Sequence, residues 1–493
     1  MKTGKKTNKI IAFLLAAVSV VTASGCAGGK ESTSAGDMPT LKYYAFASKS
    51  AIQDGEKDVV AKVREMVREK IGVDLDMEFI DTANYEQQMT VKLAAGEKID
   101  LMFVSPWLNN YANLVSKNAL RELDDLLPVY AKEYYESIPA SWWDCTRING
   151  KIYGAINQQI FARQSTLVFD EEIINQTGFD YQNVKKFEDL EPLYAKLKEM
   201  NINPLYNDYI TNLTLNTFEQ MWGFNSIGVE NSPGDVKYDD ETDIQVFNQY
   251  KSEEFKNLIA LMRDWNLKGY IKKDKLSQTN DAKILVKANP CYKPGYMEIE
   301  EENQFGRDVV FTPMGEPYVS TSNVIATMIG VTKSCKTPEK AVEFINLVNT
   351  DKELHNLICY GIEGVNYDVI GENRIKTKEN NTYSPGLDWA YGNQFNSFVQ
   401  GDMPDDVWQQ QHQFNLDAKE SSILGFNFDV TNVQIEMANC NAVVTEYLKP
   451  LLYGFMDIET SYPEFIKKLD DAGAEKIIAE KQAQLDAYIA AKQ

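Results

Sequence analysis

Histidine, cysteine and carboxylate side chains carry most catalytic and metal-binding chemistry. Their patterns in this chain indicate neither a catalytic site nor a metal site. There are only two histidines, His355 and His412, too few for a histidine metal site. The six cysteines include no C-x-x-C pair, and no G-x-S-x-G, H-E-x-x-H, P-loop or EF-hand pattern occurs. The residue types therefore predict a protein that is not an enzyme and that holds no metal or cofactor.

Cys26 is the one cysteine in a distinctive context. A lysine-rich start precedes the apolar run "IIAFLLAAVSVV" (residues 10–21), which is shorter than the ~20 residues a membrane-spanning helix needs. The run is typical of a secretory signal. It ends in "ASGC", which resembles the bacterial lipobox, with Ala23 where leucine is usual. We expect a lipoprotein signal peptide over residues 1–25 and lipidation at Cys26; a plain cleaved signal is the alternative.

Lipidation at Cys26 would attach the mature chain to the extracytoplasmic face of the cell membrane. Two fatty acyl chains, of the palmitate type, anchor a protein far better than one chain does. The small and polar residues that follow, over residues 26–40, predict a flexible tether. The remaining cysteines are expected to be buried free thiols, because free cysteine is among the most buried residue types.

The formal charge of −22 limits the partners of the chain. Nucleic acid binding needs clustered lysine and arginine to neutralise phosphates, so the sequence predicts no nucleic acid partner. Broad adhesion to anionic lipid is disfavoured for the same reason. The length of 493 residues is enough for two or three domains.

Elements that could position functional side chains begin with alternating strand and helix patterns over residues 41–105. Strands are predicted at 41–46, 73–81 and 99–105, and helices at 55–72 and from residue 83 to Gly96. This β-α-β-α-β order predicts a sheet with parallel strands covered by helices. Asn149-Gly150 predicts a hairpin turn.

The rest of the chain reads as further α/β structure with added helices. "VKYDDETDIQVFNQY" (236–250) predicts a two-stranded hairpin over acidic turn residues. A helix is predicted from Pro338, with Thr337 as its N-cap. "TDKE" (350–353) and "SYPE" (461–464) have the pattern of capping boxes, and the chain ends in a predicted helix.

Several segments resemble bacterial extracellular solute-binding proteins. They are "VKLAAGEKIDLMFVSPW" (91–107), "NGKIYGAI" (149–156), "TLVFDEEIINQTGFD" (166–180) and "TPEKAVEFINLVNTDKE" (337–353). The last third resembles an uncharacterised C-terminal domain found on a carbohydrate-binding subset of these lipoproteins. The segments that carry this likeness are "CYGIEGVNYDV" (359–369), "WAYGNQF" (389–395), "GFNFDVTNVQIEMANCNAV" (425–443) and "AGAEKIIAEKQAQLDAYI" (472–489).

The resemblance implies a two-lobed periplasmic-binding-protein-like α/β fold, with a hinge, an interlobe cleft and an extra helical C-terminal part. The first lobe would occupy residues 41–160 with later returning segments, and the second mainly residues 161–345. A helix-rich C-terminal domain over residues 346–493 would pack on the lobes. The protein would act as a monomer that captures a carbohydrate, an oligosaccharide by expectation, and passes it to ABC permease subunits.

A sugar cleft needs aromatic platforms for ring faces and amide or carboxylate groups for hydroxyls. Trp107 follows a predicted strand at its carboxyl end, where ligands collect in α/β proteins. Trp222 precedes a glycine in a predicted loop, and "WAYGNQF" interleaves aromatic and amide groups. The expected ligand-binding residues are Trp107, Trp222, Trp389, Tyr391, Asn393 and Gln394; core packing is the alternative for each.

Three other functions remain open at this point. The same fold could bind a peptide or another solute, and the chain could instead be a surface adhesin that binds a partner protein. A secreted glycan-active enzyme would need two carboxylates at a set separation. With 72 aspartates and glutamates, no pair stands out from the sequence.

Overall fold

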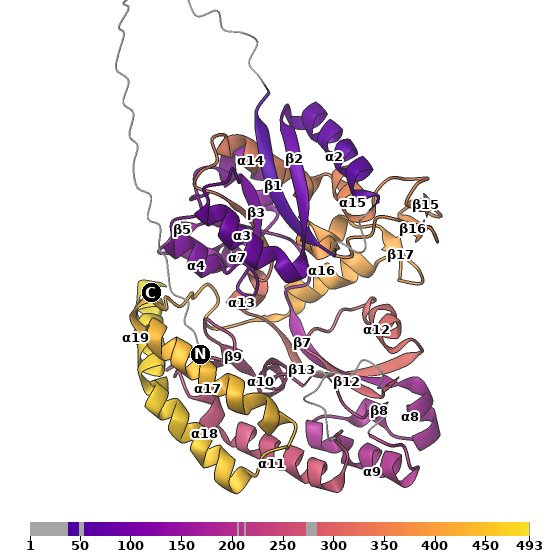
Figure 1. The fold of residues 1–493 in the computed structure, drawn as a ribbon, viewed down its shortest axis with the longest axis vertical. Coiled ribbons are helices and arrows are strands. Elements are labelled where there is room, and N and C mark those ends of the chain that lie inside the picture. The colour runs from indigo at the N-terminus through magenta and orange to yellow at the C-terminus, as the bar shows by residue number, and fades with distance from the viewer. Residues whose placement is uncertain (1–37, 49–53, 205–206, 212, 273–282, 493) are drawn as a thin grey trace, which may run out of the picture. The chain divides into compact units, whose positions relative to one another are not determined.

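Two separate β-sheets organise the chain in the computed structural model, which describes residues 38–48, 54–204, 207–211, 213–272 and 283–492 (Figure 1). Each sheet has its own helices and its own hydrophobic core. We call the body around the first sheet the first lobe and the body around the second sheet the second lobe. Within the described residues, no helix has the length and apolar character that a membrane span needs.

The first lobe is built on a sheet with the strand order β2-β1-β3-β14-β6. Its strands are β1 (Thr40–Ala47), β2 (Asp74–Asp81), β3 (Leu101–Val104), β6 (Gly154–Ile156) and β14 (Met328–Val331). Strand β1 runs parallel to both β2 and β3, as the β-α-β-α-β pattern predicts, while β14 is antiparallel to β3 and β6. Strand β14 follows the first three strands of the second lobe's sheet in the sequence. The sheet of the first lobe is therefore completed by a segment that returns from the second lobe.

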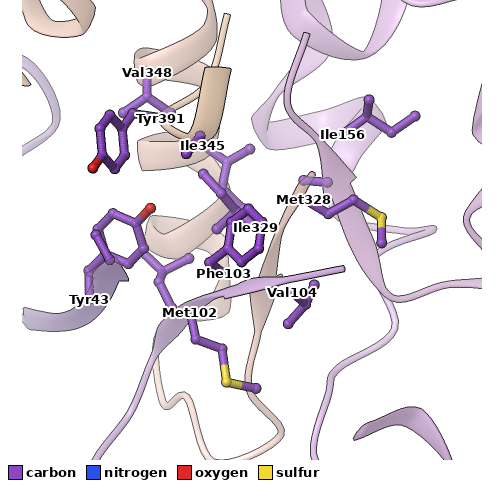
Figure 2. Close-up of a cluster of buried hydrophobic side chains, with 14 of the residues drawn as sticks. Tyr43, Met102, Phe103, Val104, Ile156, Met328, Ile329, Ile345, Val348 and Tyr391 are labelled. Carbon is purple, nitrogen blue, oxygen red and sulfur yellow. The ribbon is translucent and has the colours of Figure 1, made fainter. Parts of the chain in front are cut away.

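Helices α2 (Glu56–Ile71), α3 (Tyr85–Ala94), α14 (Pro338–Thr350) and α15 (Lys352–Tyr360) accompany this sheet. Helix α2 buries Val59, Val63 and Val67 at helical spacing, and it ends at Gly72 in the left-handed conformation (φ 64°). Figure 2 shows the core that results, with Phe103 of β3 and Ile329 of β14 beside Ile345 of α14, while the Met102 side chain points away from them.

The second lobe is built on the strand order β12-β7-β13-β18. These strands are β7 (Arg163–Asp170), β12 (Val286–Asn289), β13 (Val309–Val319) and β18 (Lys419–Glu420). The helices of this lobe include α8 (Glu171–Thr177), α9 (Glu191–Glu199), α10 (Leu215–Trp222), α11 (Glu253–Lys268) and α12 (Met297–Phe305). Strands β7 and β12 are largely buried although their sequences, RQSTLVFD and VKAN, contain several polar residues.

The last third of the chain divides between the two lobes. Helix α15 joins the core of the first lobe. Helices α17 (Gln434–Leu452), α18 (Ile458–Ala472) and α19 (Ala474–Lys492) form a third core with α11, which Figure 1 shows alongside them. The domain boundary expected at residue 346 falls inside α14, and this helix packs on the first sheet.

Three segments lead from one lobe to the other. Residues 157–162 join β6 to β7, and residues 320–327 join β13 to β14. The third connection contains helix α16 (Val407–Asp417) and ends in β18. Asn415 of α16 accepts hydrogen bonds from the backbone N–H groups of Phe161 and Ala162, at 2.7 and 2.9 Å. The first and third connections are therefore hydrogen-bonded to each other.

The hairpin predicted over residues 236–250 is wrong. Strand β10 (Asp235–Lys237) pairs instead with β9 (Phe224–Ser226). The later residues meet it only at a single bridge, in which Asp235 and Phe247 exchange backbone hydrogen bonds of 2.9 Å. The Asn149-Gly150 turn is confirmed, since β4 (Arg147–Ile148) and β5 (Lys151–Ile152) pair antiparallel across it.

Both predicted capping boxes are also wrong. Thr350 ends α14, and the next residue, Asp351, caps α15 by accepting from the Leu354 N–H at 2.9 Å. Ser461 lies inside α18, which Asp457 caps. In both cases an aspartate at a neighbouring position takes the cap, and aspartate caps at least as well as serine or threonine.

Candidate functional site

Two of the expected tryptophans, Trp107 and Trp389, lie side by side on the first lobe. Their ring centroids are 6.2 Å apart and their planes are inclined by 56°. Both rings contact Phe46 of β1, at 6.2 and 5.8 Å between centroids. Trp107 is 50% exposed. The structure therefore offers an aromatic surface supported from below by the core.

The turn after β3 presents the Trp107 ring. Pro106 follows the strand, and Asn109 adopts a left-handed backbone (φ 53°) that asparagine tolerates. The Asn109 side chain donates to the carbonyl of Phe103 at 2.8 Å, which closes the turn. Trp107 Nε1 donates to the Ala326 carbonyl at 2.7 Å, so the edge of the indole is fixed while its face stays open.

Tyr391 does not line this surface, because it is buried in the core of the first lobe. Figure 2 shows Tyr391 among the buried side chains of this core. Its hydroxyl donates to the Phe46 carbonyl at 2.6 Å, and its ring lies 5.8 Å from that of Phe79. The next residue, Gly392, has a φ of 97°, and a Cβ there would lie 2.3 Å from the Val348 carbonyl oxygen. Tyr391 and Gly392 thus hold the loop that carries Trp389, and Tyr391 has no face left for a ligand.

Asn393 and Gln394 continue the same loop. Asn393 caps the short helix η6 (Gln394–Asn396) by accepting from the Phe395 N–H at 3.0 Å. Gln394 is 4% exposed, and its Nε2 donates to Asp388 Oδ1 at 3.1 Å. Its Oε1 is buried and has no hydrogen-bond partner among the described residues. Asn393 therefore has a local structural role, while Gln394 keeps an unpaired acceptor.

Trp222 lies apart from the tryptophan pair. It ends α10 in the second lobe, where its ring stacks on Phe218 at 5.9 Å and meets Phe224 at 5.5 Å. It packs against the cores of the second lobe and of the C-terminal helices. The structure thus joins two of the expected site residues, Trp107 and Trp389, and separates Trp222 from them.

Asp388, next to Trp389, is a site residue that sequence reasoning missed. Its Oδ1 accepts from the Trp389 N–H at 3.0 Å and from Gln394, and its Oδ2 accepts from the Tyr360 hydroxyl at 3.2 Å. Burial raises the pKa of this carboxyl group above its usual value, and the positive charge of Lys293 opposes that rise. An aspartate directly before a loop tryptophan was the available signal.

Lys293 and Tyr296 lie in the second lobe, on the segment between β12 and α12, and both interact electrostatically with Asp388 of the first lobe. Lys293 Nζ lies 2.7 Å from Glu300 Oε1 and 5.5 Å from the centre of the Tyr296 ring. Burial raises the pKa of Tyr296, and the negative charges of Asp388 and Glu300 raise it further. No local sequence pattern marks these residues, because only the fold brings them near Asp388.

This arrangement suits binding more than catalysis. Open aromatic faces lie beside carboxylate, amide and ammonium groups, which is the combination that a ligand with apolar faces and polar edges requires. Within the described ranges, no group of three or more histidine, cysteine, aspartate or glutamate side chains is placed to hold a metal ion. Cys26 lies outside the described residues.

Comparison with known proteins assigns most of the chain. Residues 54–354 match the family described as bacterial extracellular solute-binding protein, and residues 422–490 match a domain of unknown function (DUF3502). A curated relative from Streptococcus pneumoniae serotype 4, named a carbohydrate ABC transporter substrate-binding protein, is 25% identical over 502 residues. The match covers 99% of each chain.

Solved structures share the fold. The N-glycan transport solute binding protein (NgtS) from Streptococcus pneumoniae has a TM-score of 0.79 at 24% identity, over 92% of this chain and 100% of that one. An HMO-binding, ABC-transporter-associated solute-binding protein from Bifidobacterium longum infantis has a TM-score of 0.62 at 16% identity, over 91% and 99% of the chains. The predicted two-lobed fold with an extra helical C-terminal part is confirmed.

Proposed function

The chain belongs to the bacterial extracellular solute-binding proteins, and from that premise we propose that it captures an oligosaccharide outside the cell and delivers it to the permease of an ABC transporter. The names of its relatives support a carbohydrate as the solute. We propose that the protein binds this ligand without converting it, as a monomer and without a cofactor.

The tryptophan pair is the observation that carries this proposal. Sugars rest their apolar ring faces on indole rings, and such aromatic side chains contribute large apolar contact areas at binding sites. The planes of Trp107 and Trp389 are inclined by 56°, so the two indoles are not parallel and cannot hold a single sugar ring between them. Each indole would instead take a separate ring, which favours an oligosaccharide over a monosaccharide.

We further propose that Cys26 carries the lipid anchor that keeps the receptor near its permease. The apolar run before Cys26 and the polar tether after it support this. Two acyl chains would hold the protein at the outer face of the membrane. A Cys26→Ser variant is expected to leave the membrane fraction and appear in the medium, which immunoblotting of cell fractions measures. Retention of the variant with the membrane would contradict the anchor.

A ligand screen tests the proposed solute. The chain from residue 31 onward would be heated with neutral oligosaccharides, monosaccharides and peptides. The panel would include Man1GlcNAc, which one structure of NgtS contains. A ligand that binds only the folded state adds about 2.7 kcal/mol of stability at a hundred times its Kd. We expect a rise in Tm with oligosaccharides; a rise with peptides alone would overturn the carbohydrate, and consumption of the sugar would indicate an enzyme.

Trp389→Ala tests whether the tryptophan pair is the site. We expect its affinity for the oligosaccharide to fall by about tenfold or more, which corresponds to ~1.4 kcal/mol or more. Isothermal titration calorimetry measures the affinity, and circular dichroism checks that the fold is kept. Trp222→Phe is the matched control, because Trp222 packs in the second lobe. Equal losses in both variants would contradict this assignment.

A further inference from the structure

We propose that Asp388 of the first lobe, together with Lys293 and Tyr296 of the second, forms a polar subsite beside the tryptophan pair. This subsite binds hydroxyl groups of neutral sugars and disfavours sugars that carry a carboxylate. The inference rests on the proposed function, because it assigns the polar half of the same site and narrows the class of its ligand.

The hydrogen bonds of Asp388 leave its carboxylate oriented but not saturated. A carboxylate accepts about four hydrogen bonds. Oδ1 accepts two, from the Trp389 N–H and from Gln394, whereas Oδ2 accepts only one, from Tyr360 at 3.2 Å. The backbone bond to Trp389 ties the position of the carboxylate to that of the platform. A sugar ring on Trp389 would therefore have an acceptor of fixed position next to its edge.

The second lobe contributes a charge pair whose lysine acts electrostatically on this carboxylate. Lys293 Nζ donates to Glu300 Oε1 at 2.7 Å, and an ammonium group has three donors in all. The two side chains are partly buried, at 20% and 25% exposure. Because Glu300 already offsets the charge of Lys293, the ammonium can donate to a neutral hydroxyl without offering an unpaired positive charge to an anion.

Four of the fourteen buried polar atoms that lack a partner among the described residues belong to residues at this junction of the two lobes. They are Glu300 Oε2, Gln394 Oε1, Gln411 Oε1 and Trp408 Nε1. Contacts link them to the subsite: Trp408 lies 6.4 Å from Tyr296, and Gln411 Nε2 donates to the Pro294 carbonyl at 3.5 Å. Buried polar groups in native proteins nearly always have partners, so partners from outside the chain are implied here.

The chemistry of these atoms selects the ligand. Three of the four are acceptors and one is a donor, so their partners must mainly donate hydrogen bonds. Sugar hydroxyl groups meet this need, and water would take their place in the free protein. A carboxylate on the sugar would instead meet Asp388 and Glu300 as like charges. Because the atoms are buried, a ligand would reach them as the lobes move about their connections.

Two variants on opposite lobes test the subsite. Asp388→Asn and Lys293→Met are each expected to weaken binding of the neutral disaccharide Man1GlcNAc by tenfold or more, measured by calorimetry, while circular dichroism checks that each variant keeps the fold. Asp402→Asn is the matched control, since Asp402 is an exposed carboxylate nearby in the sequence, and its affinity should equal that of the unaltered protein. Affinities of Asp388→Asn and Lys293→Met that match the control would overturn the subsite.

A charged analogue tests the selectivity. The same disaccharide with one C6 hydroxymethyl group oxidised to a carboxylate is expected to bind the unaltered protein at least tenfold more weakly. Asp388→Asn should narrow that difference, and equal binding of both sugars would overturn the selectivity. If the subsite variants bind normally but Trp389→Ala does not, the proposed function stands without the subsite. If no sugar binds at all, both fail together.

Discussion

His355 is a single buried residue that fastens the loop carrying Trp389. One ring nitrogen, Nδ1, lies 3.1 Å from the Tyr391 carbonyl, and the other, Nε2, lies 2.9 Å from the Ser397 hydroxyl. Burial lowers the pKa of this imidazole to about 4, and the bond to Tyr391 opposes the shift only in part. The folded protein therefore keeps His355 neutral at a pH where the unfolded chain binds a proton.

This difference predicts a loss of stability in acid. Between pH 6.5 and 4 the unfolded state binds more protons at this group than the folded state does, so the free energy of unfolding falls as the pH falls. The shift corresponds to about 3 kcal/mol, since each pKa unit is about 1.4 kcal/mol. Urea titrations of the unaltered protein and of His355→Gln across this range measure it. The variant should show a flatter dependence; parallel curves would contradict the role of His355.

At the residue scale, sequence reasoning found part of the site. Trp107 and Trp389 stand out by type and by position in loops, and the fold brings them together. The same loop pattern also suggested Tyr391, but whether a loop aromatic points inward depends on long-range packing, here on Phe46 and Phe79. Lys293 could not be found, because its nearness to Asp388 exists only once both lobes are folded.

At the element scale, helix α19 is joined to the second lobe by a buried charge. Lys481 Nζ donates to Ser232 Oγ and to the Gly234 carbonyl, both at 2.9 Å. Two carboxyl groups, those of Glu219 and Asp235, lie buried beside it. Burial raises the pKa of Asp235 to about 6 and lowers that of Lys481 to about 8, and Lys481 partly offsets the shift of Asp235.

Lys481→Met is predicted to destabilise the protein most above pH 6. There Asp235 is ionised and would be left without its cation, and such a loss costs about 3–5 kcal/mol. At pH 5 the carboxyl group is protonated, so the cost should be smaller. Thermal and urea unfolding at pH 5 and pH 7.5 measure the difference.

Lys476→Met is the control for this prediction, on the same helix. Lys476 forms an ion pair with Glu436 at the surface, so its loss should change stability far less than the loss of Lys481 at either pH. Adding Asp235→Asn to Lys481→Met should recover part of the lost stability. No recovery would mean that Lys481 acts through packing, and that its charge matters little.

The order of elements was more predictable than their ends and partners. Alternating and helical patterns found β1, α2, β2 and α3 in the right sequence because each pattern is local. The partner of β10 was missed, because β9 is a short strand without a period of its own. The caps of α15 and α18 were misplaced by a few residues, where an aspartate competed with serine or threonine.

At the scale of the whole molecule, the two lobes have separate cores and share three connections. Asn415 of α16 fastens two of them, since its amide also donates to the Gln159 carbonyl at 2.7 Å. Asn157 fastens the first connection to the loop of Trp389, by donating to the Ala390 carbonyl at 2.9 Å. Movement of one lobe about these connections would therefore also shift the loop that carries Trp389.

A ligand held by groups from both lobes should draw the lobes together. We predict that saturating oligosaccharide lowers the radius of gyration in X-ray scattering, because Trp389 and Asp388 belong to one lobe and Lys293 to the other. Lys293→Met should reduce this contraction even at ligand concentrations that fill the site. In that variant the bound sugar would be held mainly by the first lobe. Asn415→Ala should instead keep the contraction but change the ligand association rate, since it loosens the connection without removing a binding group. Full contraction in Lys293→Met would mean that closure depends on other contacts between the lobes.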